Sequence, residues 1–309
     1  MIAFIIIGLI TWLIGINNGF WIGLVVGIFY SKWSYYDNTE NEGGREWESF
    51  RKLPIWNLLK WYIGFSVIYE DKSSIKKNTA YVYAISPHGI LSFTHVFGFA
   101  IHGGECIHPF DNGIHPLAHN LLFMIPFWRE LMLWAGSKNV TKENYKRFLS
   151  KGQCISVVPG AIREMLMTTR DKLEIYEQHS GFLRISQNMN VDVIPVLAIN
   201  ENKILWPIPF IFPTIRRFLL KKLEQQEERS ESKIKFVKEI LIILLGLLTW
   251  LASIGPFPCN LKIIVGKPIQ ISEQQELCDL KILFYSKLKE LENLCDNDHK
   301  SCVEQIKFE

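Results

Sequence analysis

The sequence predicts an α/β domain with a mostly parallel sheet flanked by helices, preceded by an N-terminal hydrophobic hairpin that embeds in a membrane. Three observations predict this architecture. The first 30 residues carry no charged side chain. Short apolar runs that end at Pro or Gly follow later in the chain, and segments with helical spacing of apolar residues lie between them. Strands that alternate with helices are typical of a largely parallel sheet.

The composition lies between that of a soluble protein and that of a fully membrane-embedded one. Of the 309 residues, 48% are hydrophobic and 21% are charged. The net charge of +3 is small and scattered, so we expect no nucleic-acid partner. Six cysteines occur without any CxxC pair, which indicates free thiols in a reducing compartment. The composition therefore favours a globular domain attached to a membrane.

The uncharged N-terminal stretch is too long for one straight span. Residues Ile2–Tyr30 would extend about 43 Å as a helix, against a hydrocarbon core of about 30 Å. The turn residues Asn17–Gly19 favour a hairpin with arms Ile2–Ile16 and Phe20–Tyr30, and a single span stays open as the alternative. No basic residue precedes Lys32, so the positive-inside rule places the following chain in the cytosol.

Three regions follow from this pattern. Residues 1–31 are predicted to form the membrane-embedded hairpin or span, 32–74 a linker with an interfacial helix, and 75–309 the globular domain. The interfacial helix is expected within Leu53–Tyr69, because aromatic side chains there are typical of a membrane interface. The apolar stretch Ile240–Ile254 is short for a span and predicts either an interfacial helix or a buried core helix.

Four strands are predicted in the globular domain. Each is a short run rich in β-branched residues that ends at a Pro or Gly, or at polar residues. The predicted strands are Ala80–Ile85, Cys154–Val158, Asp192–Ile199 and Leu261–Val265.

Helices are predicted between these strands. Apolar residues at helical spacing predict helices over Thr141–Ser150 and directly after Ser180. The clearest helix is Ser272–Leu294, which opens with a capping box formed by Ser272 and Gln275. The mixed charges of Arg216–Lys238 predict a solvated helix.

Polar residues follow three of the predicted strands, where an open α/β sheet places its functional site. These strand ends are Ser86–Gly89, Val158–Glu164 and Ile199–Asn202. His88 is suited to accept a proton from an alcohol at neutral pH, and the alternative is a histidine that caps a turn or packs in the core. Glu164 could orient this imidazole, or it could be a structural partner of Arg163 or of a helix N-terminus.

A metal site is considered and not expected. His102, His108, His115 and His119 are close in sequence, and the last two have a spacing that can hold zinc on a helix. No HExxH motif or cysteine pair accompanies them. The chain also lacks a GxGxxG and a GxxxxGK[ST] motif, so nothing indicates a dinucleotide or P-loop nucleotide site.

Six blocks in this order resemble the diacylglycerol acyltransferase type 2 family, which includes monoacylglycerol and wax-alcohol acyltransferases. Each block is similar to a family signature: the strand leading to His-Pro-His-Gly, Phe-x-Arg-[Asp/Glu], Pro-Gly-Gly-x-x-Glu, Gly-Phe…Val-Pro-Val, Gly-Glu-Asn and the C-terminal blocks. The matching segments are Tyr81–Gly89, Phe127–Met132, Val157–Glu164, Gly181–Val196, Asn200–Asn202, and Pro256–Pro258 with Val265–Ile269.

The resemblance implies a membrane-anchored, glycerolipid-acyltransferase-like enzyme of the endoplasmic reticulum, with its catalytic domain facing the cytosol. It implies esterification of a neutral lipid hydroxyl by acyl-CoA, above all of diacylglycerol to triacylglycerol. The alternatives are a monoacylglycerol or a wax or phytyl-type alcohol as acceptor, a lysophospholipid acyltransferase, which would want a basic pocket that the sequence does not identify, and a non-catalytic lipid-binding homologue. Acyl-CoA is the co-substrate without a further cofactor, membrane lipids are expected partners, and a homo-oligomer stays open.

Site residues are carried over by position in these blocks. The resemblance implies that His88 is the catalytic histidine and that Glu164 matches the acid of its block. The residues implied to bind substrate or shape the site are Pro87, Gly89, Arg129, Glu130, Gly160, Arg163, Arg184, Asn200 and Glu201.

Three positions depart from the family signatures. Ser86 stands where the family has its first His, and Ala161 and Asn200 stand where it has Gly. Distantly similar glycerolipid acyltransferases carry an Asp five residues after the histidine, where this chain has Phe93. Any acid partner of His88 must therefore come from elsewhere in the chain, and Glu164 is the candidate.

We expect His88 to act as general base in direct acyl transfer. Backbone donors near the Gly89 turn, with Arg163, are expected to stabilise the oxyanion.

Overall fold

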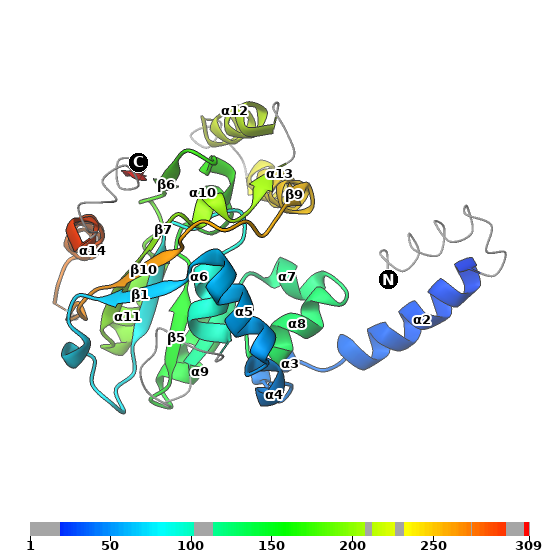
Figure 1. Ribbon diagram of the computed structural model, residues 1–309, viewed down its shortest axis with the longest axis horizontal. Coiled ribbons are helices and arrows are strands. Elements are labelled where there is room, and N and C mark those ends of the chain that lie inside the picture. Colours follow the sequence, from blue (N-terminus) through cyan, green and yellow to red (C-terminus); the bar gives the residue numbers. More distant parts are fainter. Residues whose placement is uncertain are drawn as a thin grey trace.

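The centre of the protein is a seven-stranded sheet (Figure 1). A computed structural model of the chain describes residues 19–101, 114–207, 212–225, 232–272, 274–294 and 306–308. In spatial order the strands are β1 (Ser66–Tyr69), β10 (Lys262–Val265), β7 (Val193–Ile199), β2 (Val82–Ser86), β5 (Cys154–Val157), β3 (Ile114–Ala118) and β4 (Lys138–Asn139).

Most of this sheet is parallel, as predicted. Strands β7, β2, β5, β3 and β4 run in one direction, and β10 pairs with β7 in the opposite direction. Strand β1 is parallel to β10, so the two form a reversed edge. All four predicted strands are confirmed to within two residues at each end. The carboxyl ends of β2, β5, β7 and β3 therefore meet at one edge of the sheet.

Helices cover both faces because successive side chains of a strand point to opposite sides. Val82 and Ala84 of β2 pack with α9 (Lys142–Leu149), α11 (Gly181–Met189) and α14 (Leu277–Leu291). Tyr83 and Ile85 pack on the other face with α5 (Pro54–Ile63) and with the turns α6 (Phe93–His95) and Val96–Ala100. Every residue of β2 is buried, so both layers share this strand.

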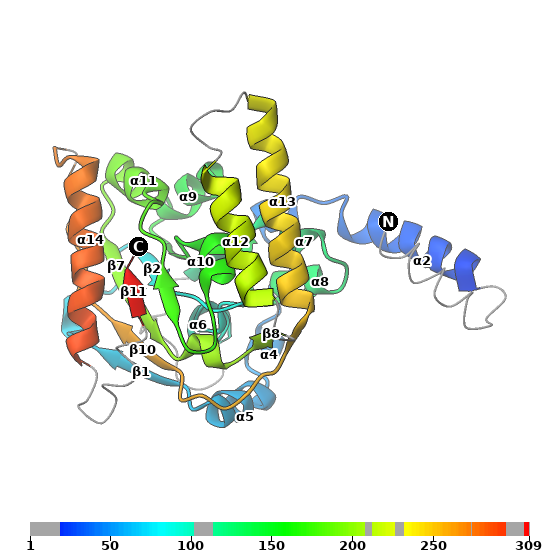
Figure 2. The same ribbon diagram turned by 90° about the horizontal axis from the view of Figure 1, so that it is seen from above.

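A second group of helices lies beyond the carboxyl edge of the sheet (Figure 2). It consists of α10 (Ala161–Met167), α12 (Phe212–Gln225) and α13 (Ser232–Leu251), which pack through Leu166, Leu220 and Ile242. Two small strand pairs join the body, β6 (Leu173–Ile175) with β11 (Ile306–Phe308), and β8 (Trp206–Pro207) with β9 (Ser253–Ile254).

Short helices connect this body to the N-terminal segment. They are α3 (Thr39–Glu42), α4 (Glu48–Arg51), α7 (Asn120–Met124) and α8 (Trp128–Trp134). Helix α2 (Gly19–Ser34) projects away from the body in both views (Figures 1 and 2). It contains the predicted second arm of the hairpin, and the first arm, Ile2–Ile16, lies outside the described residues.

Several sequence predictions are corrected. Leu53–Tyr69 contains strand β1 as well as a helix, so part of the predicted linker belongs to the sheet. The capping-box residues Ser272 and Gln275 form a separate turn, and α14 begins only at Leu277. Arg216–Lys238 spans parts of two helices, and Arg216 is fully buried rather than solvated.

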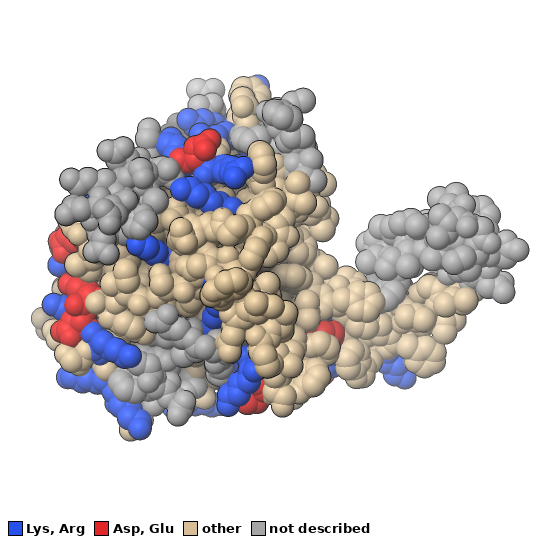
Figure 3. All heavy atoms as spheres, in the orientation of Figure 1, with Lys and Arg blue, Asp and Glu red and all other residues tan. Residues whose placement is uncertain are grey.

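One face of the molecule carries a large apolar area. Figure 3 shows a broad area, nearly free of charged side chains, that extends over α5, α13 and α2. Exposed apolar side chains of these three helices include Trp61 of α5, Phe29 of α2 and Leu248 of α13. The stretch Ile240–Ile254 thus has one buried and one exposed apolar face, with Ile242 buried. Within the described segments, no helix combines the length and apolar character that a bilayer span requires.

Candidate active site

The turn after β2 places His88 at the carboxyl edge of the sheet. A cis peptide bond joins Ser86 to Pro87, directly before the histidine. Gly89 follows, and a Cβ atom there would lie 2.7 Å from the backbone oxygen of Glu201. Only glycine therefore allows the turn after β2 to pack against the turn after β7. Pro87 and Gly89 both belong to this turn.

The His88 imidazole is buried in its neutral form. The residue is 7% exposed, and burial lowers the pKa of the imidazole to about 4. Nε2 hydrogen-bonds to the carbonyl of Ala161, and a carbonyl only accepts, so Nε2 carries the proton. Nδ1 is buried and has no hydrogen-bond partner among the described residues. The imidazole thus presents an unprotonated nitrogen that can accept a proton.

Glu164 is next to His88 but contacts its main chain. The His88 backbone N–H donates to Glu164 Oε2 at 3.1 Å, and the Tyr176 N–H donates to Oε1 at 3.2 Å. The carboxyl is fully buried, and burial raises its pKa to about 8. The side chain folds over Gly160, where a Cβ would collide with it. This geometry places Glu164 as a support of the turn that presents His88.

Glu201 supports the same turn from its other end. The Thr94 backbone N–H donates to Glu201 Oε1 at 2.7 Å, whereas Oε2 is buried without a partner in the described chain. Burial raises the pKa of this carboxyl to about 8 as well. Two buried carboxyls therefore clamp the segment from His88 to Thr94, one at each end.

The two positions that depart from the family glycines share a backbone conformation. Ala161 has φ +44° and Asn200 has φ +67°, both in the left-handed region that favours glycine. Asparagine tolerates this region, and the Asn200 side chain also donates to the Asn260 carbonyl at 3.1 Å. Ala161 is the less suited residue, and its carbonyl is the one that binds His88.

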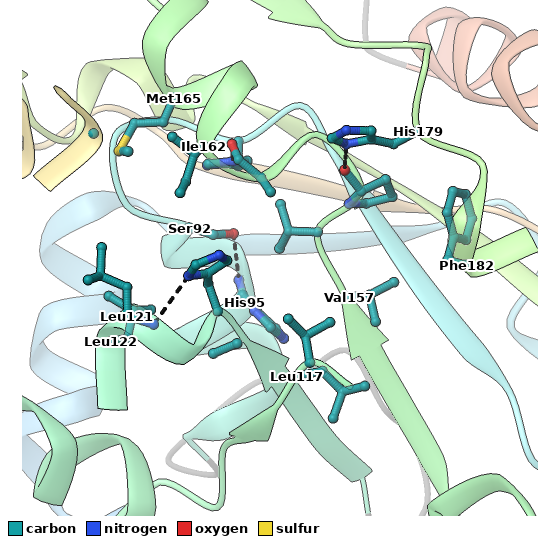
Figure 4. A pocket seen from close by; sticks show the side chains of 18 of the residues that line it. Ser92, His95, Leu117, Leu121, Leu122, Val157, Ile162, Met165, His179 and Phe182 are labelled. Carbon is teal, nitrogen blue, oxygen red and sulfur yellow. Dashed lines mark hydrogen bonds between the residues drawn. The ribbon is translucent and has the colours of Figure 1, made fainter. Parts of the chain in front are cut away.

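His88 lines an apolar cavity of about 510 Å³, part of which is drawn in Figure 4. Leu117, Leu121, Leu122 and Val157 form part of its wall. Helix α13 contributes another part of the wall, through residues such as Trp250. This volume lies within the range of small-molecule sites and suits an apolar ligand.

Three further histidines line this cavity and were not singled out by sequence reasoning as active-site residues. His95 Nε2 bonds to Ser156 Oγ at 2.8 Å, and burial lowers the His95 pKa to about 4. His119 accepts the Leu121 N–H at 3.2 Å, and His179 Nδ1 donates to the Pro159 carbonyl at 2.7 Å. No sequence motif marks them, because their positions depend on turns far apart in the chain.

Arg129 and Glu130 lie in a buried ion-pair cluster instead of the cavity wall. Arg129 Nη2 binds Glu40 Oε2 at 2.7 Å, and its Nε donates to the Ser34 carbonyl at 3.1 Å. Glu130 Oε2 binds Arg45 Nη1 at 3.1 Å, and Glu130 also accepts from the Ser34 hydroxyl. We call this set the α8 clasp, because it fastens α8 to the chain that follows α2.

Two other predicted site arginines, Arg163 and Arg184, do not line the cavity either. Arg163 binds Glu239 of α13 at 3.2 Å, and its guanidinium lies over the Tyr176 ring, so other groups already engage it. Arg184 is exposed on α11. The structure therefore brings together His88 and Glu164 with the backbone of their turns.

The histidines considered for zinc do not form a cluster in the described part of the chain. His115 is on strand β3, not on a helix, and stacks on Phe148 with ring centroids 4.1 Å apart. His119 caps the start of α7. His102 and His108 lie outside the described residues. Among those described, no group of three His, Cys, Asp or Glu side chains could hold a metal.

Comparison with known proteins agrees with the motifs. A family model described as diacylglycerol acyltransferase matches residues 17–307. Diacylglycerol O-acyltransferase 2 of Dictyostelium discoideum is 27% identical over 91% of this chain and 84% of its own length. Human 2-acylglycerol O-acyltransferase 3 is 23% identical over 89% and 80%, respectively. The crystal structure of the 1-acyl-sn-glycerophosphate acyltransferase PlsC from Thermotoga maritima aligns with 95% of this chain and 97% of its own, at 14% identity and a TM-score of 0.45.

Proposed function

This chain belongs to the diacylglycerol acyltransferase family and is an acyltransferase of neutral lipids, and we propose that His88 is the general base of its reaction. The observation that carries the proposal is the position of this imidazole. It is neutral, it has a free buried nitrogen, and it opens into an apolar cavity at the carboxyl edge of the sheet. A general base needs this combination of geometry and protonation state.

The first step is proton transfer from the acceptor hydroxyl to His88 Nδ1. Because Nε2 donates to Ala161, the imidazole holds the tautomer in which Nδ1 is the basic nitrogen. The hydroxyl oxygen attacks the thioester carbon of acyl-CoA as its proton leaves. The clamp of Glu164 and Glu201 keeps the imidazole in place during this step.

The second step breaks the bond between carbon and sulfur. The tetrahedral oxyanion is stabilised by backbone N–H groups of the turn that follows His88. Arg163, the other predicted oxyanion donor, is less suited because Glu239 binds it. CoA leaves as a thiolate and takes the proton from the imidazolium. The sequence of steps uses acyl-CoA as co-substrate and needs no covalent acyl-enzyme and no further cofactor.

Diacylglycerol is the proposed acceptor, with triacylglycerol as product. The cavity of about 510 Å³ would hold the reacting ends of the acyl donor and the acceptor. Monoacylglycerol is the second candidate, because a human relative named 2-acylglycerol O-acyltransferase is similar over almost the same share of the chain.

We further propose that the enzyme works at the endoplasmic reticulum membrane with its catalytic domain in the cytosol. The exposed apolar side chains of α2, α5 and α13 support the membrane contact in this proposal, because a contiguous apolar surface is typical of a membrane or protein contact. In this arrangement residues 1–31 embed in the bilayer, residues 75–309 carry most of the acyltransferase domain, and the segment 32–74 joins the two and contributes strand β1 to the sheet.

The test is acyl transfer in microsomes from cells that lack their own triacylglycerol synthesis. The full chain and His88→Ala are supplied with labelled acyl-CoA and with diacylglycerol, monoacylglycerol or a fatty alcohol. His88→Gln is the matched variant, since its amide can still donate to the Ala161 carbonyl but cannot accept the proton. We expect labelled triacylglycerol from the full chain and none from either variant, with membrane attachment unchanged.

The other outcomes decide between the candidates. Label only in another ester would keep the chemistry and change the acceptor. Retained activity in either His88 variant would contradict the general-base role. No labelled ester from well-expressed protein would favour a non-catalytic lipid-binding homologue.

A further inference from the structure

The cavity wall contains a buried hydrogen-bond donor that has no partner within the described residues. Trp128, the first residue of α8, lines the cavity, and its indole Nε1 is buried without an acceptor. We propose that the Trp128 N–H binds an ester carbonyl of the glycerolipid acceptor and so distinguishes it from acceptors without esters. The inference rests on the proposed function and assigns a residue that contacts the acceptor.

An unpaired buried N–H is a strong indication of a ligand. Buried Trp side chains usually place their N–H on an acceptor, and a buried donor left without one costs about 1–3 kcal/mol. The nearby wall residues of the cavity, such as Leu121, Leu122 and Met132, are apolar and offer no strong acceptor. A carbonyl oxygen brought in by the substrate would satisfy the indole.

The position of Trp128 favours the acceptor over acyl-CoA as the source of that carbonyl. Trp128 packs edge-to-face against Trp250 of α13, with ring centroids 5.0 Å apart, and both side chains line the cavity. The outer surfaces of the two helices are apolar, with Phe127 59% exposed on one side and Leu251 65% exposed on the other. A neutral lipid would therefore reach the cavity from an apolar surface at this Trp pair.

The chemistry of the acceptors sets the specificity. A diacylglycerol has one reacting hydroxyl and two ester carbonyls, and a carbonyl is a good acceptor for an indole N–H. A dialkylglycerol has the same hydroxyl and chains but ether oxygens in place of the esters. The thioester carbonyl of acyl-CoA must instead lie near His88 for attack. The Trp128 N–H should thus favour the ester acceptor over its ether analogue.

The experiment compares Trp128→Phe with the unmodified chain in membranes, using a diacylglycerol and the matching dialkylglycerol. Phenylalanine keeps an aromatic ring and removes the N–H. We expect the unmodified chain to prefer the ester by roughly five- to tenfold in kcat/KM, and the variant to lose this preference with an unchanged KM for acyl-CoA. The ester-to-ether ratio is measured within each variant, so it does not depend on the amount of folded protein.

Trp134→Phe is the matched control. Trp134 is the last residue of α8 and forms a similar edge-to-face pair with Trp47, at 5.3 Å, away from the cavity. We expect its ester preference to equal that of the unmodified chain. An unchanged preference in Trp128→Phe, or a raised KM for acyl-CoA instead, would overturn the assignment. If the unmodified chain esterified neither acceptor, the proposed function itself would fail, which is a separate result.

Discussion

At the scale of single residues, the two buried carboxyls beside His88 differ in one respect that can be tested. Glu164 accepts a backbone N–H on each oxygen, whereas Glu201 accepts one on Oε1 and leaves Oε2 without a partner in the described chain. A glutamine has one acceptor oxygen and one NH₂ group. It can replace the neutral form of Glu201, but at Glu164 its NH₂ would face a backbone donor.

We expect Glu201→Gln to retain transfer activity at pH 7 and Glu164→Gln to be destabilised by about 1–3 kcal/mol. The pH dependence of folding stability follows from the pKa of Glu201, which burial raises from 4.5 to about 8. A raised carboxyl pKa stabilises the fold most below pH 4.5, and this contribution is lost as the pH rises through 8. Glu201→Gln should therefore lose less stability than the unmodified chain between pH 6.5 and pH 9.

Thermal unfolding of the purified full chain and these variants at pH 6.5 and pH 9 measures the effect. The neutral His88 and His95 contribute fully above pH 6.5, because burial lowers their pKa values to about 4, so they do not change in this window. Glu143→Gln, at an exposed position of α9, is the control. A pH dependence of Glu201→Gln equal to that of the control would contradict the assignment.

Sequence patterns indicate some residues of the site and not others. His88 and Glu164 follow strands at Pro-rich or Gly-rich breaks, and that position in an α/β fold predicts a site. His95 and Trp128 have no such signal, because a single His or Trp in an apolar segment is compatible with any core. The contact of Glu164 with a main-chain N–H, and not with the imidazole, depends on side-chain geometry that no motif encodes.

At the scale of elements, the α8 clasp joins the end of α2 and the segment after it to the catalytic body. Arg129 is 1% exposed and binds Glu40 and the Ser34 carbonyl, while Trp128 next to it lines the cavity. Arg129→Ala would leave Glu40 without its partner in a largely buried setting. Removing one member of a buried ion pair costs about 3–5 kcal/mol.

We expect Arg129→Ala to lower the free energy of unfolding by about that amount, and to reduce acyl transfer through displacement of α8. Arg184→Ala, on the exposed side of α11, serves as control because it removes the same side chain from a solvated position. Thermal unfolding and transfer assays on both variants make the comparison. Similar small effects for the two arginines would show that the clasp contributes little.

Elements were predictable where local pattern and burial agree. Strands β2, β5, β7 and β10 are β-branched runs with clear breakers, and both faces of each are covered by helices. Strand β3 contains His115 and Pro116, which do not resemble a strand in isolation, and its pairing with β5 fixes its conformation. The wrong start of α14 arose because a capping box can close a turn without beginning a helix.

At the scale of the whole molecule, the cavity and the apolar surface share helix α13. Ile243 and Leu247 of α13 line the cavity, while Leu244 and Leu248 on its other side are about half exposed. The sequence could not choose between an interfacial and a core helix for Ile240–Ile254, because hydropathy does not record which side faces outward. The structure assigns both environments to one helix, so that α13 contributes to the cavity wall and to the apolar surface.

Lipid contact of this outer side can be measured in the full chain. Leu248 is 56% exposed on α13 and Ile282 is 64% exposed on α14, which lies on the other side of the body (Figure 2). We expect Leu248→Cys in microsomes to react slowly with a water-soluble maleimide and Ile282→Cys to react readily, because a thiol in lipid is neither hydrated nor ionised. The native cysteines are accounted for by labelling the unmodified chain in parallel, and unfolded samples should label equally. Equal reaction rates for Leu248→Cys and Ile282→Cys in intact membranes would place the outer side of α13 in water. The acceptor could then not pass directly from the bilayer to Trp128.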